Sequence, residues 1–162
     1  MKIEAKKRNA LVEKPKLVVT VRDKVGKDNA LVVAYACNCS YDPPMIMVGI
    51  VESRFSYHMI KENGCFVVHL LDQSQTDLYK VCGTMSGRDS DKLKDNNIKL
   101  EDAKTVNASV IVDCPVQIEC EVVDSIKTGS HEMFVGKVTY VHAEEACVND
   151  QGFVDINKLN LI

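Results

Sequence analysis

The chain has 162 residues, of which 46% are hydrophobic and 27% charged, and its 20 basic and 23 acidic residues give a formal net charge of −3. These values fit one globular domain over residues 1–162 and exclude a disordered chain, a collagen and a coiled coil. The acidic excess argues against nucleic-acid binding, which favours a basic surface. Apolar runs are too short to span a bilayer, and the N-terminus lacks the apolar stretch of a signal peptide. We therefore expect a cytoplasmic protein with no membrane partner.

Seven cysteines are present, an odd number that cannot all pair within one chain. Their spacing contains no C-x-x-C, and the two tight pairs typical of zinc sites are absent. The one close pair is Cys37 and Cys39. We expect free thiols that pack mostly as small buried side chains, and no structural metal site.

Strands are predicted throughout the first third of the chain. Residues 16–21 and 30–36 are rich in β-formers, and the polar segment 22–29 between them reads as a hairpin loop. Two prolines interrupt the chain in the segment 41–44, because proline cannot donate to a strand ladder. Residues 45–51 then form an apolar run that predicts a buried strand.

A helix follows these strands. Ser53 is a suitable N-cap residue, and Phe55, Met59 and Ile60 form one apolar stripe at helical spacing. Gly64 can end the helix in the left-handed conformation.

The middle segment alternates between structure types. Residues 65–71 predict a strand, residues 74–81 a short amphipathic helix, and residues 86–97 a polar loop with a helical turn near Asp91.

The last third is predicted to be β. In 116–122 apolar and polar residues alternate, which indicates a half-exposed strand, and 133–141 predicts another strand after a turn at 127–130. A further turn is expected at 149–152. Six strands with inserted helices indicate a closed or half-closed antiparallel barrel.

Two segments carry groups that suit an anion. At the predicted helix start, Ser53, Arg54 and Ser56 combine two hydroxyls and a guanidinium with unpaired backbone amides. The alternative is an ordinary helix cap with a solvent-facing arginine.

The second segment is 82–92. Gly83 and Gly87 permit close backbone approach, and Arg88 and Lys92 supply donors. Two aspartates in the same segment weaken the anion interpretation, and a surface loop is the alternative. The glycine and lysine spacing excludes a P-loop and a dinucleotide-binding fingerprint.

Four histidines could take part in chemistry. His58 is expected to face solvent, whereas His69 and His142 lie in predicted strands and are expected to have satisfied partners in the core or at its rim. His131 follows a turn, at a position where a cleft residue is plausible. The sequence selects no Cys–His dyad.

Taken in order, six segments resemble those of the flavin reductase-like, FMN-binding split-barrel proteins, the group that includes flavoredoxin. The resemblance runs from about residue 16 to residue 159, nearly the whole chain. Each segment alone is a weak signal, but their joint order and spacing are specific. The segments are YDPP (41–44), SRFSY (53–57), NGCFVV (63–68), CGTMSGRDSDK (82–92), DCP (113–115) and GSHEMFVGKV (129–138).

The resemblance implies a mainly β fold, a six-stranded antiparallel Greek-key split barrel with a few flanking helices. It also implies a homodimer that binds FMN near the subunit interface. Its activity would be that of a flavin-dependent oxidoreductase of the flavin reductase type, with NAD(P)H as electron donor and an unidentified acceptor. Two alternatives stay open: a flavoredoxin-like electron carrier with tightly held FMN and no direct use of pyridine nucleotide, and a non-catalytic β-barrel interaction domain.

By position, the resemblance implies cofactor contacts from one strand, one helix start and one loop. His131 corresponds to a family histidine near the redox side of the flavin, which makes it the candidate catalytic residue. The strand would line the isoalloxazine, the helix start would hold the phosphate, and the loop would close over phosphate and ribityl. These residues are Ala36, Cys37, Asn38 and Cys39 for the ring; Ser53, Arg54 and Ser56, with Tyr57 beside them, for the phosphate; and Ser86, Gly87 and Lys92 for the loop.

Cys37 and Cys39 depart from the small or hydroxyl residues of many relatives. Strand alternation places Cys37 and Cys39 on one face. Their thiols either face the flavin and tune its potential or face the core and pack there, and packing is the favoured interpretation.

Overall fold

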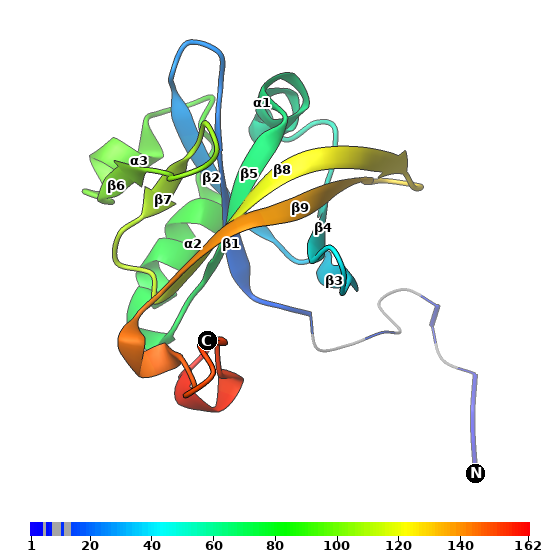
Figure 1. Cartoon of the computed structure of the whole chain (residues 1–162). Coiled ribbons are helices and arrows are strands. Elements are labelled where there is room, and N and C mark those ends of the chain that lie inside the picture. The colour runs from blue at the N-terminus through cyan, green and yellow to red at the C-terminus, as the bar shows by residue number, and fades with distance from the viewer. Residues whose placement is uncertain (5, 8–10, 12–13) are drawn as a thin grey trace.

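The computed structural model describes residues 1–4, 6–7, 11 and 14–162, and its main feature is a strongly curled antiparallel sheet (Figure 1). In the described residues this sheet has seven strands in the order β2-β1-β5-β8-β9-β4-β3. A separate two-stranded sheet pairs β6 with β7. The strands are β1 (Leu17–Arg22), β2 (Asp28–Val33), β3 (Ala36–Ser40), β4 (Met45–Ile50), β5 (Cys65–Leu70), β6 (Leu100–Asp102), β7 (Ser109–Ile111), β8 (Val116–Lys127) and β9 (Glu132–Ala143).

Three α-helices and three short 3₁₀ turns connect the strands. The helices are α1 (Phe55–Asn63), α2 (Thr76–Thr84) and α3 (Lys92–Asp95), and the 3₁₀ turns are Gln73–Gln75, Glu145–Cys147 and Ile156–Lys158. The chain passes from β4 through α1 to β5, which lies beyond β9 and β8 in the sheet order. None of the helices in the described ranges is long and apolar enough to cross a membrane.

The expected mainly β antiparallel split barrel with a few helices is confirmed, with seven strands in the main sheet in place of the six predicted. The predicted strand 30–36 is interrupted at Ala34 and Tyr35, so that β2 pairs with β1 while β3 pairs with β4. The Gly49 amide donates to the Tyr35 carbonyl at 2.7 Å, which joins the bend to β4. Because β2 and β3 are consecutive in the chain and lie at opposite ends of the sheet order, the sheet curls until these ends meet.

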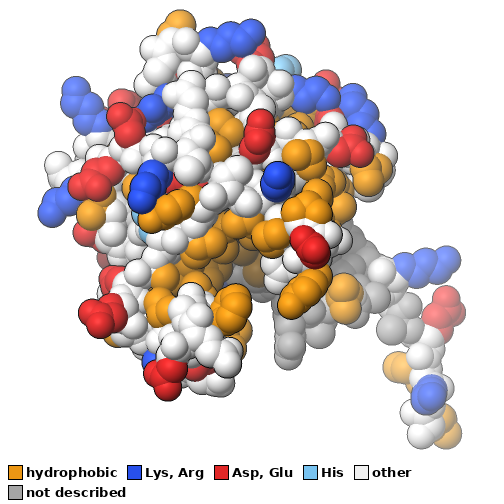
Figure 2. Space-filling view, in the orientation of Figure 1, with side chains coloured by type: hydrophobic (Ala, Val, Ile, Leu, Met, Phe, Trp, Pro, Cys, Tyr) orange, Lys and Arg blue, Asp and Glu red, His pale blue; other side chains and the backbone are white. Residues whose placement is uncertain are grey.

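The barrel core lies between the curled sheet and α1. Val19, Val21, Phe66, Ile60 and Phe134 belong to one buried cluster, so the apolar stripe of α1 packs on the strands as its spacing predicts. On the face in Figure 2, apolar side chains gather near the centre, above the C-terminal segment.

Both ends of α1 bear on the sequence predictions. Gly64 ends the helix in the left-handed conformation at φ 70°, and its amide donates to the Ile60 carbonyl at 2.9 Å. The expectation that Ser53 caps the N-terminus is wrong, since the cap position is Arg54 and no side chain caps it. The amides at this end are therefore left without a capping side chain.

Strand β8 is more buried than its alternation predicts. Gln117 and Glu119 occupy its polar face and are both buried, Glu119 fully. Glu119 accepts hydrogen bonds from the backbone amides of Lys104 at 2.7 Å and Thr105 at 2.6 Å, in the loop between β6 and β7. This loop covers Glu119, whereas Glu121 is exposed as the alternation predicts.

The cysteines lie in the described part of the chain and all seven have free thiols. Five are buried, as expected, but Cys37 and Cys39 are exposed. The interpretation in which these two pack in the core is therefore wrong, because β3 is an edge strand whose side chains reach solvent.

Candidate functional site

A cavity of about 500 Å³ lies between β2, the start of α1, the second half of α2 and the loop leading to α3. Five of the residues expected to hold a phosphate or ribityl chain line it together: Arg54, Ser56, Ser86, Gly87 and Lys92. The two segments that suit an anion, 53–56 and 82–92, thus meet across one cavity.

The helix side of the cavity presents unused donors. Arg54 is exposed at the uncapped start of α1, and its guanidinium has no recorded partner among the described residues. Ser56 is buried, and its hydroxyl oxygen accepts from the Asn29 side-chain amide at 2.8 Å. The Ser56 proton is therefore available to an acceptor in the cavity.

The loop side of the cavity is fixed by close packing. A Cβ on Gly87 would lie 2.6 Å from Oδ1 of Asn29 and 2.8 Å from the Phe55 ring, so glycine is required for this approach. The Arg88 guanidinium donates to the Ser53 carbonyl at 2.8 Å, and Lys27 Nζ donates to the Gly87 carbonyl at 3.3 Å. These contacts tie the loop to the start of α1 and to the β1–β2 hairpin.

Lys92 supplies a buried positive charge at the base of the cavity. Its Nζ donates to the carbonyls of Met85 at 2.8 Å and Cys82 at 3.3 Å, at the C-terminal end of α2. Burial lowers the pKa of Lys92 from its ordinary value. No carboxylate in the described ranges pairs with it, so a bound anion would supply the missing negative charge.

A smaller cavity of about 160 Å³ continues from the first. Both cavities share Leu31, Val32 and Arg54, and the smaller one also reaches Tyr35 and His131. The rings of Tyr35 and His131 lie 4.6 Å apart, and Nδ1 of His131 lies 2.8 Å from the Ser130 hydroxyl. Arg54 therefore lies between an end lined with hydrogen-bond donors and a mostly apolar end that carries one histidine.

Other residues named for the site lie elsewhere. Ala36, Cys37, Asn38 and Cys39 form β3, which begins directly after Tyr35 but lines neither cavity. Ser53 is exposed and also lies outside both linings. The contact of these residues with a cofactor stays a prediction.

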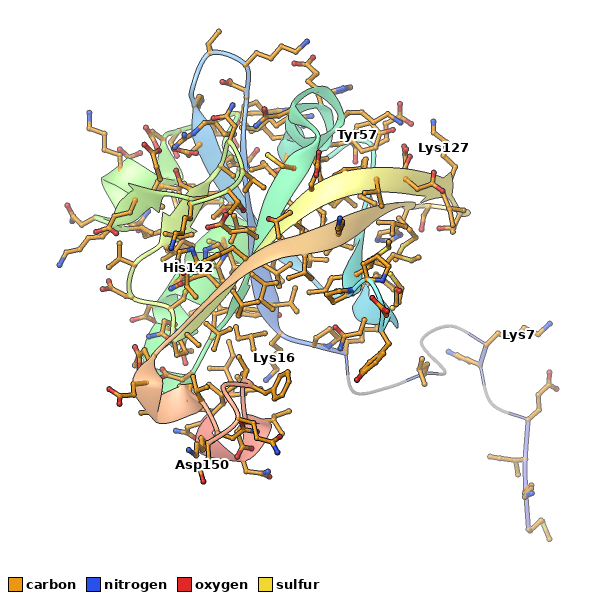
Figure 3. The ribbon with its side chains drawn as sticks, viewed as in Figure 1. Lys7, Lys16, Tyr57, Lys127, His142 and Asp150 are labelled. Atoms are coloured by element: carbon orange, nitrogen blue, oxygen red, sulfur yellow. The ribbon has the colours of Figure 1, made fainter. Side chains whose placement is uncertain are left out.

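Tyr57 lies on the opposite flank of α1. Its hydroxyl donates to the Glu132 carboxylate, and Lys61 Nζ lies 2.6 Å from the same carboxylate. These hydrogen bonds hold the pKa of Glu132 at about 2. Figure 3 shows Tyr57 and Lys127 toward one end of the β8–β9 hairpin and His142 toward the other.

The other histidines behave as their positions predict. His58 is exposed. His69 is fully buried; its Nε2 accepts from the Ile111 amide at 2.9 Å, and its Nδ1 lies 3.3 Å from the Val18 carbonyl. His142 Nε2 lies 2.6 Å from the buried Glu119 carboxylate.

Sequence reasoning missed Asn29 and Phe55 as parts of the site. Asn29 bonds Ser56 and contacts Gly87, although it stands in a segment that reads only as a hairpin loop. Phe55 lies against the same glycine, where its apolar character had marked it as a core residue. Only the approach of three separate segments reveals both roles.

Comparison with known proteins identifies the family. Residues 10–158 match the model of the flavin reductase like domain. An uncharacterized protein of Archaeoglobus fulgidus is 33% identical over 134 residues, which cover 82% of this chain and 74% of that protein. A Streptomyces pristinaespiralis protein named NADH:riboflavin 5'-phosphate oxidoreductase is 26% identical over 78% of this chain and 69% of its own length.

The fold comparison agrees. The solved structure of flavoredoxin from Desulfovibrio vulgaris (Miyazaki F) superposes with a TM-score of 0.89 and 26% identity, covering 98% of this chain and 85% of that one. With its split-barrel fold and its match over nearly the whole length, this chain belongs to the flavin reductase-like domain family.

Proposed function

We propose that this protein binds FMN in the two joined cavities and acts as an NAD(P)H-dependent flavin reductase. The observation that carries the proposal is the convergence of Arg54, Ser56, Ser86, Gly87 and Lys92 on one cavity without a pairing carboxylate in the described ranges. The printed name of the Streptomyces relative, an NADH:riboflavin 5'-phosphate oxidoreductase, supports the electron donor.

Each group has a physical role in this proposal. Arg54 and Lys92 bind the phosphate by charge, and the hydroxyls of Ser56 and Ser86 donate to its oxygens. The uncapped amides of α1 add donors at a positive helix end. Gly87 brings the loop backbone close enough to close the anion end of the site.

The smaller cavity is proposed to receive the isoalloxazine. Leu31 and Val32 provide an apolar wall that excludes water, and β3, which follows Tyr35, would flank the ring with residues 36–39. His131 would stand at its redox side; because Nδ1 lies against Ser130, Nε2 is the nitrogen left to hold or donate a proton. Bound FMN would supply hydride and electron transfer chemistry. A homodimer and an acceptor that the structure does not identify belong to the same proposal.

A second candidate is a flavoredoxin-like electron carrier, which holds FMN without using pyridine nucleotide directly. The similarity to a flavoredoxin over 98% of this chain favours it. The two candidates share the binding site and differ only in the electron donor.

Binding and bleaching experiments test both points. We expect FMN to bind the purified protein in a fluorescence titration, and Arg54→Ala to weaken binding by about 1.5–3 kcal/mol, the contribution of a hydrogen bond to a charged group. His58→Ala is the matched control, since His58 is exposed on the same helix and lines neither cavity. Equal FMN affinity in wild type and Arg54→Ala would remove Arg54 from the site.

Anaerobic mixing then separates the candidates. Rapid loss of the oxidised flavin absorbance on addition of NADH or NADPH is expected for a reductase. A bound flavin that both nucleotides leave oxidised would support the carrier instead. Absence of FMN binding would reject both.

A further inference from the structure

Two exposed thiols lie two residues apart on an edge strand, and the proposed function places them beside the flavin ring without giving them a chemical role. Cys37 and Cys39 are exposed, whereas the other five cysteines are buried. β3 pairs with β4 on one side and is the last strand of its sheet in the described chain. Both thiols are thus open to a reagent from solvent.

Cys37 and Cys39 are two residues apart on one short strand. Residues two apart on a strand share a face, with Cα atoms about 6.6 Å apart in regular geometry. A disulfide bridges Cα atoms about 4.4–6.8 Å apart, so a regular strand is near the upper limit. Bonding the sulfur atoms therefore requires the strand to depart from regular geometry.

The structure contains an irregularity at this position. Asn38 pairs with Ile46 and Ser40 with Met45, so Cys39 is an extra residue without a partner in β4. A bulge of this kind bends the strand and frees it from the ladder. An edge strand with a bulge can adjust without breaking the sheet.

The two thiols are distinguished by the surroundings of Cys39. Partial burial and the neighbouring Cys37 raise the pKa of Cys39 above its ordinary value. Less of Cys39 is therefore present as thiolate, and Cys37 is the thiol assigned to the first attack.

We propose that Cys37 and Cys39 form a redox-active dithiol that reduces low-molecular-weight disulfides. The Cys37 thiolate attacks one sulfur of the disulfide, which breaks its S–S bond and releases one thiolate that takes up a proton. The Cys39 thiol then loses its proton and attacks the mixed disulfide at Cys37, which releases the second thiol. The protein gains one Cys37–Cys39 disulfide and loses two electrons and two protons, and the substrate becomes two thiols.

The buried cysteines are unsuited to this reaction. Burial raises the pKa of Cys114 and of Cys120 to about 12 and that of Cys82 to about 11. Their thiolate fractions are small at neutral pH, and their sulfur atoms are covered. Reaction at the exposed pair is therefore selective.

Mass spectrometry of one tryptic peptide tests the proposal. Cleavage after Lys27 and Arg54 gives peptide 28–54, which contains Cys37 and Cys39 and no other cysteine. The reduced full-length protein is incubated with glutathione disulfide, and its free thiols are then alkylated. After tryptic digestion, the mass of peptide 28–54 is measured. We expect a peptide without glutathione or alkyl groups and lighter by two hydrogen atoms than the reduced peptide, and reversal by a reducing agent.

Two variants identify the order of attack, and a third is the control. Cys39→Ser is expected to keep glutathione on Cys37, because the resolving thiol is gone, whereas Cys37→Ser is expected to react more slowly. Cys147→Ser, which removes a buried thiol distant in sequence, is expected to behave as wild type.

The wild-type peptide alone can overturn the proposal. Glutathione retained on it would show that the two thiols react separately, and a fully alkylated peptide would show that neither reacts. Because the measurement requires no flavin, its result is independent of the flavin-binding experiment.

Discussion

Buried His69 illustrates how single residues set the stability of this barrel. Its ring is fully buried between β1 and β7, and both nitrogens have backbone partners. The Ile111 amide donates to Nε2, so Nε2 must be an unprotonated acceptor and the imidazole is neutral. Protonating Nε2 would break this hydrogen bond. Burial accordingly lowers the pKa of His69 from 6.5 to about 4.

The His69 environment predicts a loss of stability in mild acid. Between pH 6.5 and 4 the unfolded chain binds a proton at His69 that the folded chain does not bind, so the free energy of unfolding falls as pH falls. The expected loss from this group is about 3 kcal/mol at pH 4. Urea unfolding at several pH values measures it.

A variant isolates this contribution. His69→Gln should flatten part of the pH dependence, whereas His58→Gln, at an exposed position, should leave it unchanged. An identical slope in wild type and His69→Gln would contradict the assignment. If His69→Gln does not fold, the wild-type curve still decides, since a free energy of unfolding that stays constant from pH 6.5 to 4 excludes the effect.

At the scale of elements, Glu119 connects β8 to the loop between β6 and β7. It accepts from two backbone amides, from the Thr105 hydroxyl at 2.5 Å and from His142. Burial alone would raise the pKa of Glu119, but these hydrogen bonds outweigh it and the pKa is lowered. The stabilisation is therefore present at neutral pH and is lost as pH falls through the lowered value.

Glu119→Gln should detach this loop. One carboxylate oxygen becomes an NH₂ group that faces existing donors, so the expected cost is about 2 kcal/mol in the free energy of unfolding. Amide hydrogen exchange at Lys104 and Thr105 should accelerate. Glu121→Gln, two residues along the strand and exposed, is the control; equal losses in the two variants would contradict the role of the buried carboxylate.

The sequence predicted the elements that contribute long apolar runs. Strands β1, β4, β5 and β9 and helix α1 have patterns set by local spacing, and Gly64 marks the helix end by its own conformational freedom. β6 and β7 were missed, because three residues each are too few to carry a period. The burial of Glu119 was missed because it depends on a loop distant in sequence.

The candidate site was predictable to a similar extent. The chemistry of Arg54, Ser56 and Lys92 is visible in the sequence as donors suited to an anion, but their convergence is a property of the fold. Asn29 gives no local signal, since its role depends on Ser56 and Gly87 reaching it from other elements.

At the scale of the whole molecule, the core allows almost no added volume at Gly136. A Cβ there would overlap the Phe66 ring and lie 2.8 Å from the Cys120 Cβ, so strands β5, β8 and β9 meet around this position. Both neighbouring side chains are fully buried and have no free space to move into.

Gly136→Ala should therefore destabilise the barrel. Overpacking of a tight core typically costs about 1–3 kcal/mol, and we expect a loss in this range in urea unfolding. Gly129→Ala is the matched control, because a Cβ at Gly129 would meet nothing within 4 Å. Wild-type stability in Gly136→Ala would show that the three strands separate more easily than their packing indicates.

The bend at Ala34 and Tyr35 joins two strands, β2 and β3, that lie at opposite edges of the same sheet. Residues 28–33 form one edge strand of the sheet and residues 36–40 form the other. The number of residues in the bend therefore determines which side chains of β3 point inward when those of β2 are fixed. Deleting or inserting a single residue there would exchange the inward and outward side chains of one strand relative to its neighbour. The length of the bend is therefore fixed by the fold, and the orientation of Cys37 and Cys39 depends on it.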